Sequence, residues 1–263
     1  MEKIPLVKYD HPDFLKQSVS YIKEYGAFIL TDFISKDNLP LLIKLAEEST
    51  KFNNLLDKNY KHGKLYTYHY KELFNIRYFL NLLIKQRNFS FLRRLNINNN
   101  IKKNCDLKNI SSLLKVLKYN CFYSTHNKHS IYITYDRNHT KHSAQKPHFD
   151  WRPCLKAMIY LDDCEKSSQG GLFYLLKSHN YNSLKHGINR INGFLPGKHD
   201  GYKQFQITNF SKEKFSYSGT KAGNLLIFNT DGFHYQGKNT SSKFNRIIRI
   251  HSYLHDTKIR NGA

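Results

Sequence analysis

Three side chains of this sequence could bind one metal ion: His148 and Asp150 near the middle of the chain, and His234 near its C-terminal end. Two imidazole nitrogens and one carboxylate occupy one face of an octahedral Fe(II) ion and leave the opposite face open for a chelating co-substrate and O₂. His148 and Asp150 are two positions apart, so they point to the same side if they lie on a strand. The residue types therefore predict an Fe(II) centre, provided that the fold brings His234 back to the other two.

Arg246 follows His234 by 12 positions and could form a bidentate pair with the far carboxylate of the co-substrate 2-oxoglutarate. Arg249 is the alternative, and an odd spacing places the two arginines on opposite faces of one strand. We favour Arg246. Tyr132 and Thr134 share one face of a predicted strand and are candidates to hydrogen-bond 2-oxoglutarate, with simple packing as the alternative role. Together these residues predict a non-haem iron oxygenase.

The positions of these residues follow the predicted strands. β-Branched and aromatic runs predict strands at 27–30, 130–135, 156–161, 172–176, 224–229 and 243–254, with His148 at the start of another. Apolar residues at helical spacing predict helices over 12–25, after a cap at Ser35 or Asp37, near 74–85 and over 111–117. Short strands in one half and helices in the other indicate a mainly β fold with α: a jelly-roll, cupin-like barrel with a helical N-terminal layer.

We expect a single domain over residues 1–263. Residues 1–125 should be mostly helical support with one early strand, and residues 126–256 the jelly-roll core, interrupted by a long polar insertion at 177–221. Basic residues of this insertion could recruit an anionic small molecule, although a solvated loop would have the same composition. They are Lys185, His186, Arg190, Lys198, His199 and Lys203.

The formal net charge is +22, from 42 Lys and Arg against 20 Asp and Glu. Such a charge attracts nucleic acid, anionic lipid or small anions. The charges are spread along the chain, however, and the accompanying richness in Asn, Ile and Tyr is typical of a biased codon composition. Four widely spaced cysteines without a C-x-x-C pair indicate reduced thiols rather than zinc or disulfides. The sequence shows no secretory signal and no apolar run long enough to span a membrane, so we expect a soluble cytoplasmic protein.

The order of these motifs resembles the phytanoyl-CoA dioxygenase-like family of Fe(II)/2-oxoglutarate oxygenases. The resemblance covers roughly residues 25–50 and 130–254. It is carried by the stretches Tyr25–Ile34, Pro147–Trp151, Ile159–Cys164, Gly170–Leu175, Ser178–His179, Gly223–Phe228 and His234–Asn239, together with Arg246. It implies a double-stranded β-helix that binds Fe(II) and 2-oxoglutarate.

Two features depart from the family pattern. Leu176-Lys177 replaces the Pro-Gly that usually precedes Ser-His, and Arg246 falls one place later than in the closest pattern, which keeps Arg249 as an alternative. We expect Ser178 and His179 to be structural rather than catalytic.

The resemblance also implies a reaction. 2-Oxoglutarate and O₂ would be converted to succinate and CO₂ while an unactivated C–H bond of a small, anionic metabolite is hydroxylated. Related halogenases have a small residue in place of the ligand carboxylate, so Asp150 favours hydroxylation over halogenation. Desaturation and cyclisation remain open.

Two other functions are compatible with some features of the sequence. A nucleic-acid oxygenase of the alkylation-repair type would suit the positive charge, but that group carries two arginines six apart, whereas Arg246 and Arg249 are three apart. A barrel without catalytic activity could serve as a binding module, but the complete set of candidate ligands argues against it.

Overall fold

The structure is a computed structural model. It describes residues 2–44, 46–47, 63–64, 68–69, 107–125, 129–136, 145–150, 154–180, 204–206, 212–241 and 245–254. The predicted helix near 74–85 and the six basic residues of the insertion lie outside these residues.

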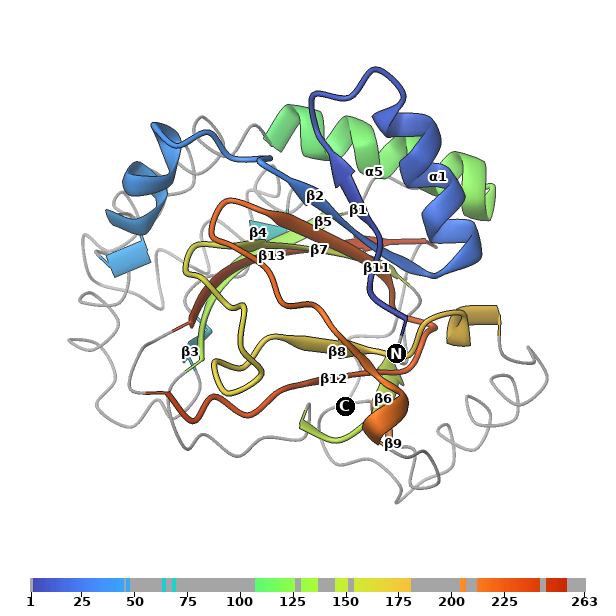
Figure 1. Ribbon diagram of the computed structural model, residues 1–263. Helices are drawn as coiled ribbons and strands as arrows, with labels where there is room; N and C mark the ends of the chain where they lie inside the picture. The colour runs from blue at the N-terminus through green and yellow to red at the C-terminus, as the bar shows by residue number, and fades with distance from the viewer. Residues whose placement is uncertain are drawn as a thin grey trace, which may run out of the picture.

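Two β-sheets and a few helices make up the described part of the chain (Figure 1). The 8-stranded sheet has the order β1-β2-β11-β7-β13-β5-β3, with β4 also paired to β5, and the 5-stranded sheet has the order β10-β8-β12-β6-β9. The large sheet contains β1 (Leu6–Lys8), β2 (Ala27–Thr31), β3 (Gly63–Lys64), β4 (Tyr68–His69), β5 (His129–Asp136), β7 (Cys154–Tyr160), β11 (Leu225–Asn229) and β13 (Asn245–Tyr253). The small sheet contains β6 (His148–Asp150), β8 (Leu172–Tyr174), β9 (Gln204–Gln206), β10 (Ser216–Tyr217) and β12 (His234–Gln236).

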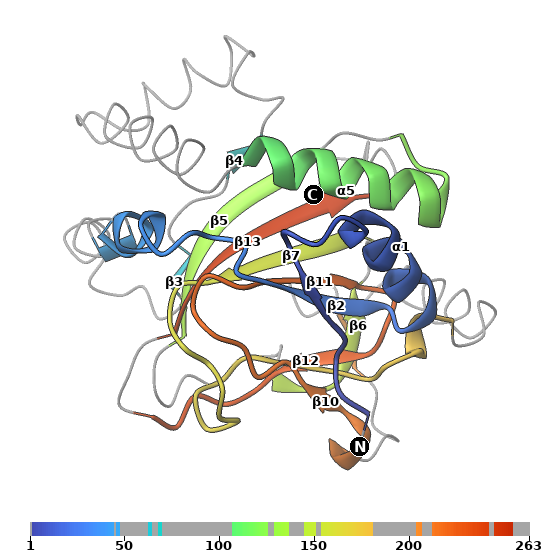
Figure 2. The same cartoon turned by 45° about the horizontal axis from the view of Figure 1, so that its top comes forward.

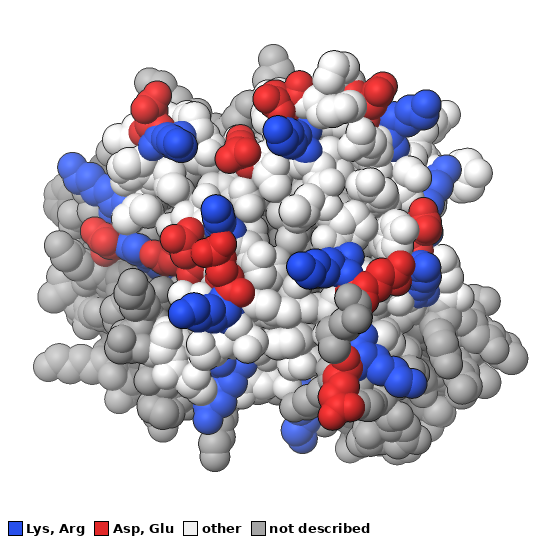
Figure 3. All heavy atoms as spheres, viewed as in Figure 1, with Lys and Arg blue, Asp and Glu red and all other residues white. Residues whose placement is uncertain are grey.

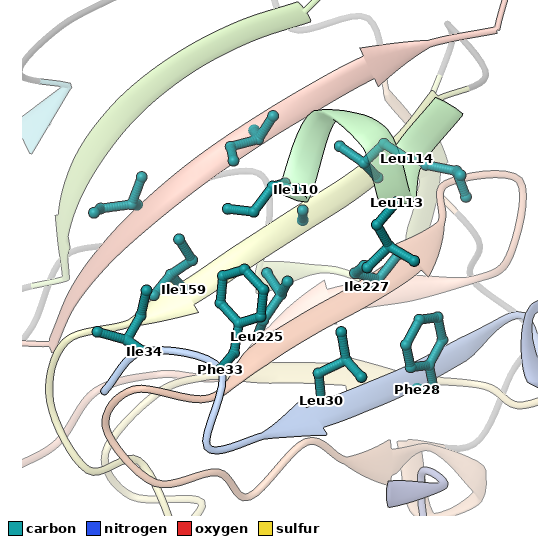
Figure 4. Close-up of a cluster of buried hydrophobic side chains, with 14 of the residues drawn as sticks. Phe28, Leu30, Phe33, Ile34, Ile110, Leu113, Leu114, Ile159, Leu225 and Ile227 are labelled. Atoms are coloured by element: carbon teal, nitrogen blue, oxygen red, sulfur yellow. The ribbon is translucent and has the colours of Figure 1, made fainter. Parts of the chain in front are cut away.

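Helices α1 (Phe14–Glu24) and α5 (Leu107–Phe122) lie across one face of the large sheet, as Figures 1 and 2 show from two directions. Residues 38–44 form a further helix, and Ser35 caps it by accepting a hydrogen bond from the backbone N–H of Asn38 at 3.3 Å, as the sequence predicted. The apolar cluster between the helices and the sheet is drawn in Figure 4 and includes Ile110 and Leu114 of α5 against Ile159 of β7. Full burial of such a side chain contributes about 1.5–3 kcal/mol.

The opposite face of the large sheet packs against the small sheet. Because side chains alternate along a strand, β7 presents Ile159 to the helices and Met158 and Tyr160 to the space between the sheets. Leu172 and Tyr174 of β8 meet them from the small sheet. Both faces of the large sheet are therefore buried in its central strands. This sheet-rich arrangement is consistent with a cupin-like fold, while closure of the barrel and the full N-terminal helical layer stay predictions.

The strands expected near 27–30, 130–135, 156–161, 172–176, 224–229 and 243–254 are present, with ends that differ by a few residues. The insertion is more structured than we predicted. Within 177–221 the chain forms the 3-10 helices η3 (Ser178–Asn180) and η4 (Lys212–Lys214) and the short strands β9 and β10. These strands carry little apolar alternation and are defined by pairing with β6 and β8.

None of the helices that the structure describes has both the length and the apolar character to cross a bilayer.

Candidate metal centre

The small sheet brings the three predicted ligands together. Strands β6 and β12 are antiparallel neighbours, and their register places His148 opposite His234. Asp150 lies two residues further along β6, so its side chain is on the same side as that of His148. The residues in between, Phe149 and Tyr235, point to the other side and join an aromatic cluster there. The alternation along both strands therefore directs all three candidate ligands into the space between the sheets.

Local contacts fix the start of β12, where His234 lies. The backbone N–H of Phe233 donates to Ser178 Oγ at 2.8 Å, and Ser178 Oγ donates to the carbonyl of Leu175. A side chain at Gly232 is excluded, because a Cβ there would lie 1.9 Å from the Tyr174 hydroxyl oxygen. His179 Nε2 contacts the carbonyl oxygen of Lys23 at 3.0 Å, at the end of α1. Ser178 and His179 thus hold the chain around the site, in line with the structural role expected for them.

The two histidines present the same ring nitrogen to the centre. Nδ1 of His148 lies 2.7 Å from the carbonyl oxygen of Lys146, and Nδ1 of His234 lies 2.8 Å from that of Gly232. A carbonyl oxygen only accepts hydrogen bonds, so each Nδ1 carries the proton and each Nε2 keeps its lone pair. Asp150 Oδ1 lies 3.8 Å from Nε2 of His148 and 3.5 Å from Nε2 of His234.

The protonation states also suit metal binding. Burial, and then the neighbouring His234, lower the pKa of His148 to about 3, so its imidazole is neutral at neutral pH. Burial on its own would raise the pKa of Asp150, but the neighbouring Lys156 ammonium holds it well below its usual value. Metal ligands must be deprotonated, and both groups meet that requirement without a change of protonation.

A divalent metal ion fits this arrangement. The donor atoms of His148, Asp150 and His234 all lie within 4.8 Å of one another. Neighbouring ligands of an octahedral ion with bonds of about 2.1 Å lie roughly 3 Å apart, so small rotations would complete the geometry. In the described part of the chain, His234 Nε2 is buried without a hydrogen-bond partner. A buried polar atom without a partner is costly, and a metal ion would satisfy it.

Arg246 is not brought to this centre. Its guanidinium forms two hydrogen bonds with Asp162, from Nε to Oδ2 at 2.8 Å and from an Nη to Oδ1 at 2.5 Å, and its other Nη donates to Glu47 at 2.8 Å. Arg246 shares its face of β13 with Ile248 and Ile250, which pack toward the helices. Its donors are held by two carboxylates on the side of the sheet away from the triad, which is a structural role.

Arg249 lies on the other face of β13, the face that Ile247 shares with the residues between the sheets. In the sheet it pairs with Met158 of β7 and Tyr132 of β5. Its Nε donates to Thr134 Oγ1 at 2.9 Å. Thr134 therefore contacts the arginine that we ranked second, whereas the side chain of Tyr132 is outside the described residues. The two arginines lie on opposite faces of β13, as their spacing predicted, and Arg249 rather than Arg246 is on the face toward the triad. Which of them binds 2-oxoglutarate stays a prediction.

Lys156 is a residue of the site that the sequence analysis missed. Its Nζ lies 2.6 Å from Asp150 Oδ2, and its side chain comes from β7, across the space between the sheets. The signal in the sequence was a lone charge within an otherwise apolar strand, Cys154–Tyr160.

Comparison with solved structures supports the fold. The epimerase SnoN, solved with Fe3+, alpha ketoglutarate and nogalamycin RO, aligns with a TM-score of 0.51 over 96% of this chain and 93% of its own, at 12% identity. EvdO2 from Micromonospora carbonacea var. aurantiaca, solved with 2-oxoglutarate, gives a TM-score of 0.48 over 98% and 96% of the two chains, at 14% identity. AviO1 from Streptomyces viridochromogenes Tue57 gives 0.47 over 94% and 97%, at 12% identity. At such identities the likeness establishes the fold alone, and the match to SnoN carries that conclusion.

Comparisons with protein-family models and with curated protein sequences give no match. Membership of the phytanoyl-CoA dioxygenase-like family therefore stays a prediction. Fold and site together define a sheet-rich protein with a buried His-Asp-His triad between two sheets.

Proposed function

We propose that this chain is an Fe(II)- and 2-oxoglutarate-dependent oxygenase that hydroxylates a C–H bond of a small molecule. The observation that carries the proposal is the convergence of two Nε2 lone pairs and one carboxylate oxygen, all within 4.8 Å, from His148, His234 and Asp150. This donor set is the facial triad of non-haem Fe(II) oxygenases. SnoN, which shares the fold, was solved with Fe3+ and alpha ketoglutarate, and this supports the same cofactors here.

We assign the anchoring of 2-oxoglutarate to Arg249. A guanidinium can hold a carboxylate with two parallel hydrogen bonds. Arg249 is on the metal-facing side of β13, and its bond to Thr134 Oγ1 fixes the direction of the guanidinium plane. Thr134 then orients the arginine, and Tyr132, which pairs with Arg249 in the sheet, is a further candidate contact.

Iron, when bound, would activate O₂ with 2-oxoglutarate as the electron donor, so that one oxygen atom ends in succinate, with release of CO₂, and the other in the hydroxylated product. The residues of the chain hold and orient the reactants and exclude water. Phe228 contributes to this, since its ring lies 5.1 Å from that of His234, and Met158 adds a second apolar side chain between the sheets. SnoN is described as an epimerase, so an outcome other than hydroxylation is the alternative for the same site.

The first prediction concerns the purified protein without oxygen. Anaerobic addition of Fe(II) and then 2-oxoglutarate should produce a weak visible charge-transfer band, because the 2-oxo group and the adjacent carboxylate would together chelate the iron. The band should be absent with Fe(II) alone or with succinate in place of 2-oxoglutarate. A folded protein that binds Fe(II) and gives no band would instead favour a binding module without this chemistry.

The substrate is proposed to be a small anionic metabolite. The net charge of +22 would attract any anion, nucleic acid included. A nucleic-acid oxygenase would be expected to gather its basic groups into a continuous stripe or patch. On the face shown in Figure 3, the Lys and Arg side chains of the described residues are interspersed with Asp and Glu. The described residues of this face therefore form no continuous basic stripe, which supports a small molecule rather than nucleic acid as the ligand of this face.

The second prediction separates the two substrate classes. In a gel-shift experiment with single-stranded oligonucleotides, any binding at low salt should weaken to the non-specific range at physiological salt, because it would rest on phosphate charge alone. Non-specific binding at physiological salt has a Kd of about 10⁻⁴ to 10⁻⁶ M. A Kd well below 10⁻⁶ M at physiological salt would favour the nucleic-acid oxygenase.

A further inference from the structure

Lys156 occupies an unusual position for a lysine. It lies in β7, in the interior of the large sheet, where its backbone neighbours are Phe228 of β11 and His251 of β13. The other residues of β7 on the same face, Cys154, Met158 and Tyr160, are buried, and Met158 and Tyr160 pack between the sheets. The Lys156 side chain is itself only 12% exposed. A lysine in such surroundings is rare unless its charge is paired.

The charge of Lys156 lies beside the carboxylate of Asp150. Its Nζ lies 2.6 Å from Oδ2 of Asp150, whose side chain is 15% exposed. The other oxygen, Oδ1, lies 3.5 Å from Nε2 of His234 and 3.8 Å from Nε2 of His148. The two oxygens of one carboxylate thus have separate neighbours, with Oδ1 among the histidines and Oδ2 at the lysine.

We propose that Lys156 is a positioning residue that holds Oδ2 of Asp150, so that the carboxylate offers only Oδ1 to the metal. This inference rests on the proposed function of the same site. Residues that hydrogen-bond a metal ligand, without contacting the metal themselves, commonly fix how that ligand binds the metal. Here the lysine fixes which oxygen is presented, while backbone carbonyls fix which nitrogen each histidine presents.

The contact between Lys156 and Asp150 determines how many coordination positions of the metal stay open. Three donor atoms leave three positions of an octahedral ion for other molecules. A 2-oxo acid that chelates through two atoms takes two of these, and one is left for a diatomic gas. If Oδ2 also turned to the metal, that last position would be lost, while the two for the 2-oxo acid would remain. Removal of Lys156 should therefore weaken binding of the gas more than binding of the 2-oxo acid.

Stability alone is a weaker explanation of the pair. Replacing a buried ion pair by apolar residues is often neutral or stabilising, since both charges lose their hydration. β7 already has apolar residues on this face, so a further apolar residue would suit the packing. The contact with a candidate metal ligand accounts for the lysine where packing does not.

The third prediction tests Lys156 with nitric oxide as a probe for the gas position. Anaerobic samples of wild type, Lys156→Met and Lys156→Arg are loaded with Fe(II) and 2-oxoglutarate and titrated with nitric oxide, and the iron–nitrosyl signal is followed by electron paramagnetic resonance. Lys156→Met should keep the charge-transfer band. It should bind nitric oxide about 10- to 100-fold more weakly, which is the usual effect of losing a residue that hydrogen-bonds a metal ligand. Lys156→Arg keeps a cationic donor and should restore most of the affinity.

Lys118→Met is the matched control, because Lys118 is also buried but lies in α5, where its Nζ approaches the carbonyl oxygen of Tyr253 at 3.5 Å. It should leave both signals unchanged. Unaltered nitric oxide binding in Lys156→Met, or an equal loss of band and nitric oxide binding, would overturn the positioning role. Absence of the band from wild type would instead overturn the proposed function itself.

A measurement on the wild type keeps the proposal testable even if Lys156→Met does not fold. In crystals loaded with iron and 2-oxoglutarate, Nζ of Lys156 should remain within hydrogen-bonding distance of Oδ2, and only Oδ1 should bind the metal. Coordination by both oxygens of Asp150 would refute the proposal.

Discussion

Replacing Arg249 by Leu should weaken the binding of 2-oxoglutarate about 100-fold, or roughly 2.7 kcal/mol, because a bidentate charged contact to its far carboxylate would be lost. The loss should appear as a higher KM for 2-oxoglutarate and a weaker charge-transfer band at a fixed concentration. Iron binding should be unchanged, since Arg249 is not one of the three donors. Titration of the band with 2-oxoglutarate under anaerobic conditions measures the effect.

Arg246→Leu is the matched comparison, three residues away on the opposite face of β13. It removes the contacts to Asp162 and Glu47, so we expect a loss of about 1–3 kcal/mol in the free energy of unfolding. Its affinity for 2-oxoglutarate should stay within a few-fold of wild type. If Arg246→Leu abolished 2-oxoglutarate binding and Arg249→Leu did not, the assignment of the two arginines would be reversed.

Replacing His234 by Ala should abolish activity and lower Fe(II) affinity by far more than the 10- to 100-fold typical of losing a residue that hydrogen-bonds a metal ligand, because a ligand itself is removed. The effect should be visible as loss of iron after gel filtration and loss of the charge-transfer band. The fold should survive, since the substitution removes one hydrogen bond, from Nδ1 to the carbonyl oxygen of Gly232, while Nε2 has no hydrogen-bond partner within the described residues.

The control for this substitution is His179→Ala. His179 lies close to β12 but bonds to the carbonyl of Lys23, so its removal should lower thermal stability without changing the amount of bound iron. Should His234→Ala retain stoichiometric iron at wild-type affinity, the triad would not be the iron site.

The candidate metal ligands could be predicted from the sequence because their arrangement depends on local rules. The two-residue spacing of His148 and Asp150 places them on one side of any strand, and β6 obeys this rule. The apolar and β-branched runs that became β7, β11 and β13 were long enough to be recognised, and they position His234 through the turn that follows β11.

The assignment of the arginine could not be settled in the same way. Alternation showed that Arg246 and Arg249 face opposite sides, but it did not show which side is inner. Both faces of β13 carry buried isoleucines, Ile247 toward the small sheet and Ile248 toward the helices. Because hydrophobic residues lie on both faces of β13, their pattern does not show which face points toward the small sheet and which toward the helices.

Lys156 and the strands of the insertion were missed for a related reason. The contact of Lys156 with Asp150 joins two sheets, so no spacing along the chain indicates it. β9 is short and polar, and it is a strand because it pairs with β6 beside the metal ligands. Features created by tertiary pairing leave little trace in a single sequence.

The central claim is that His148, Asp150 and His234 hold one iron ion, and an anomalous difference map from a crystal grown anaerobically with Fe(II) tests it most directly. We expect a single strong peak between the two sheets, about 2.0–2.3 Å from Nε2 of both histidines and from Oδ1 of Asp150. An iron peak bound elsewhere, or no peak between the sheets in a protein that contains stoichiometric iron, would contradict it.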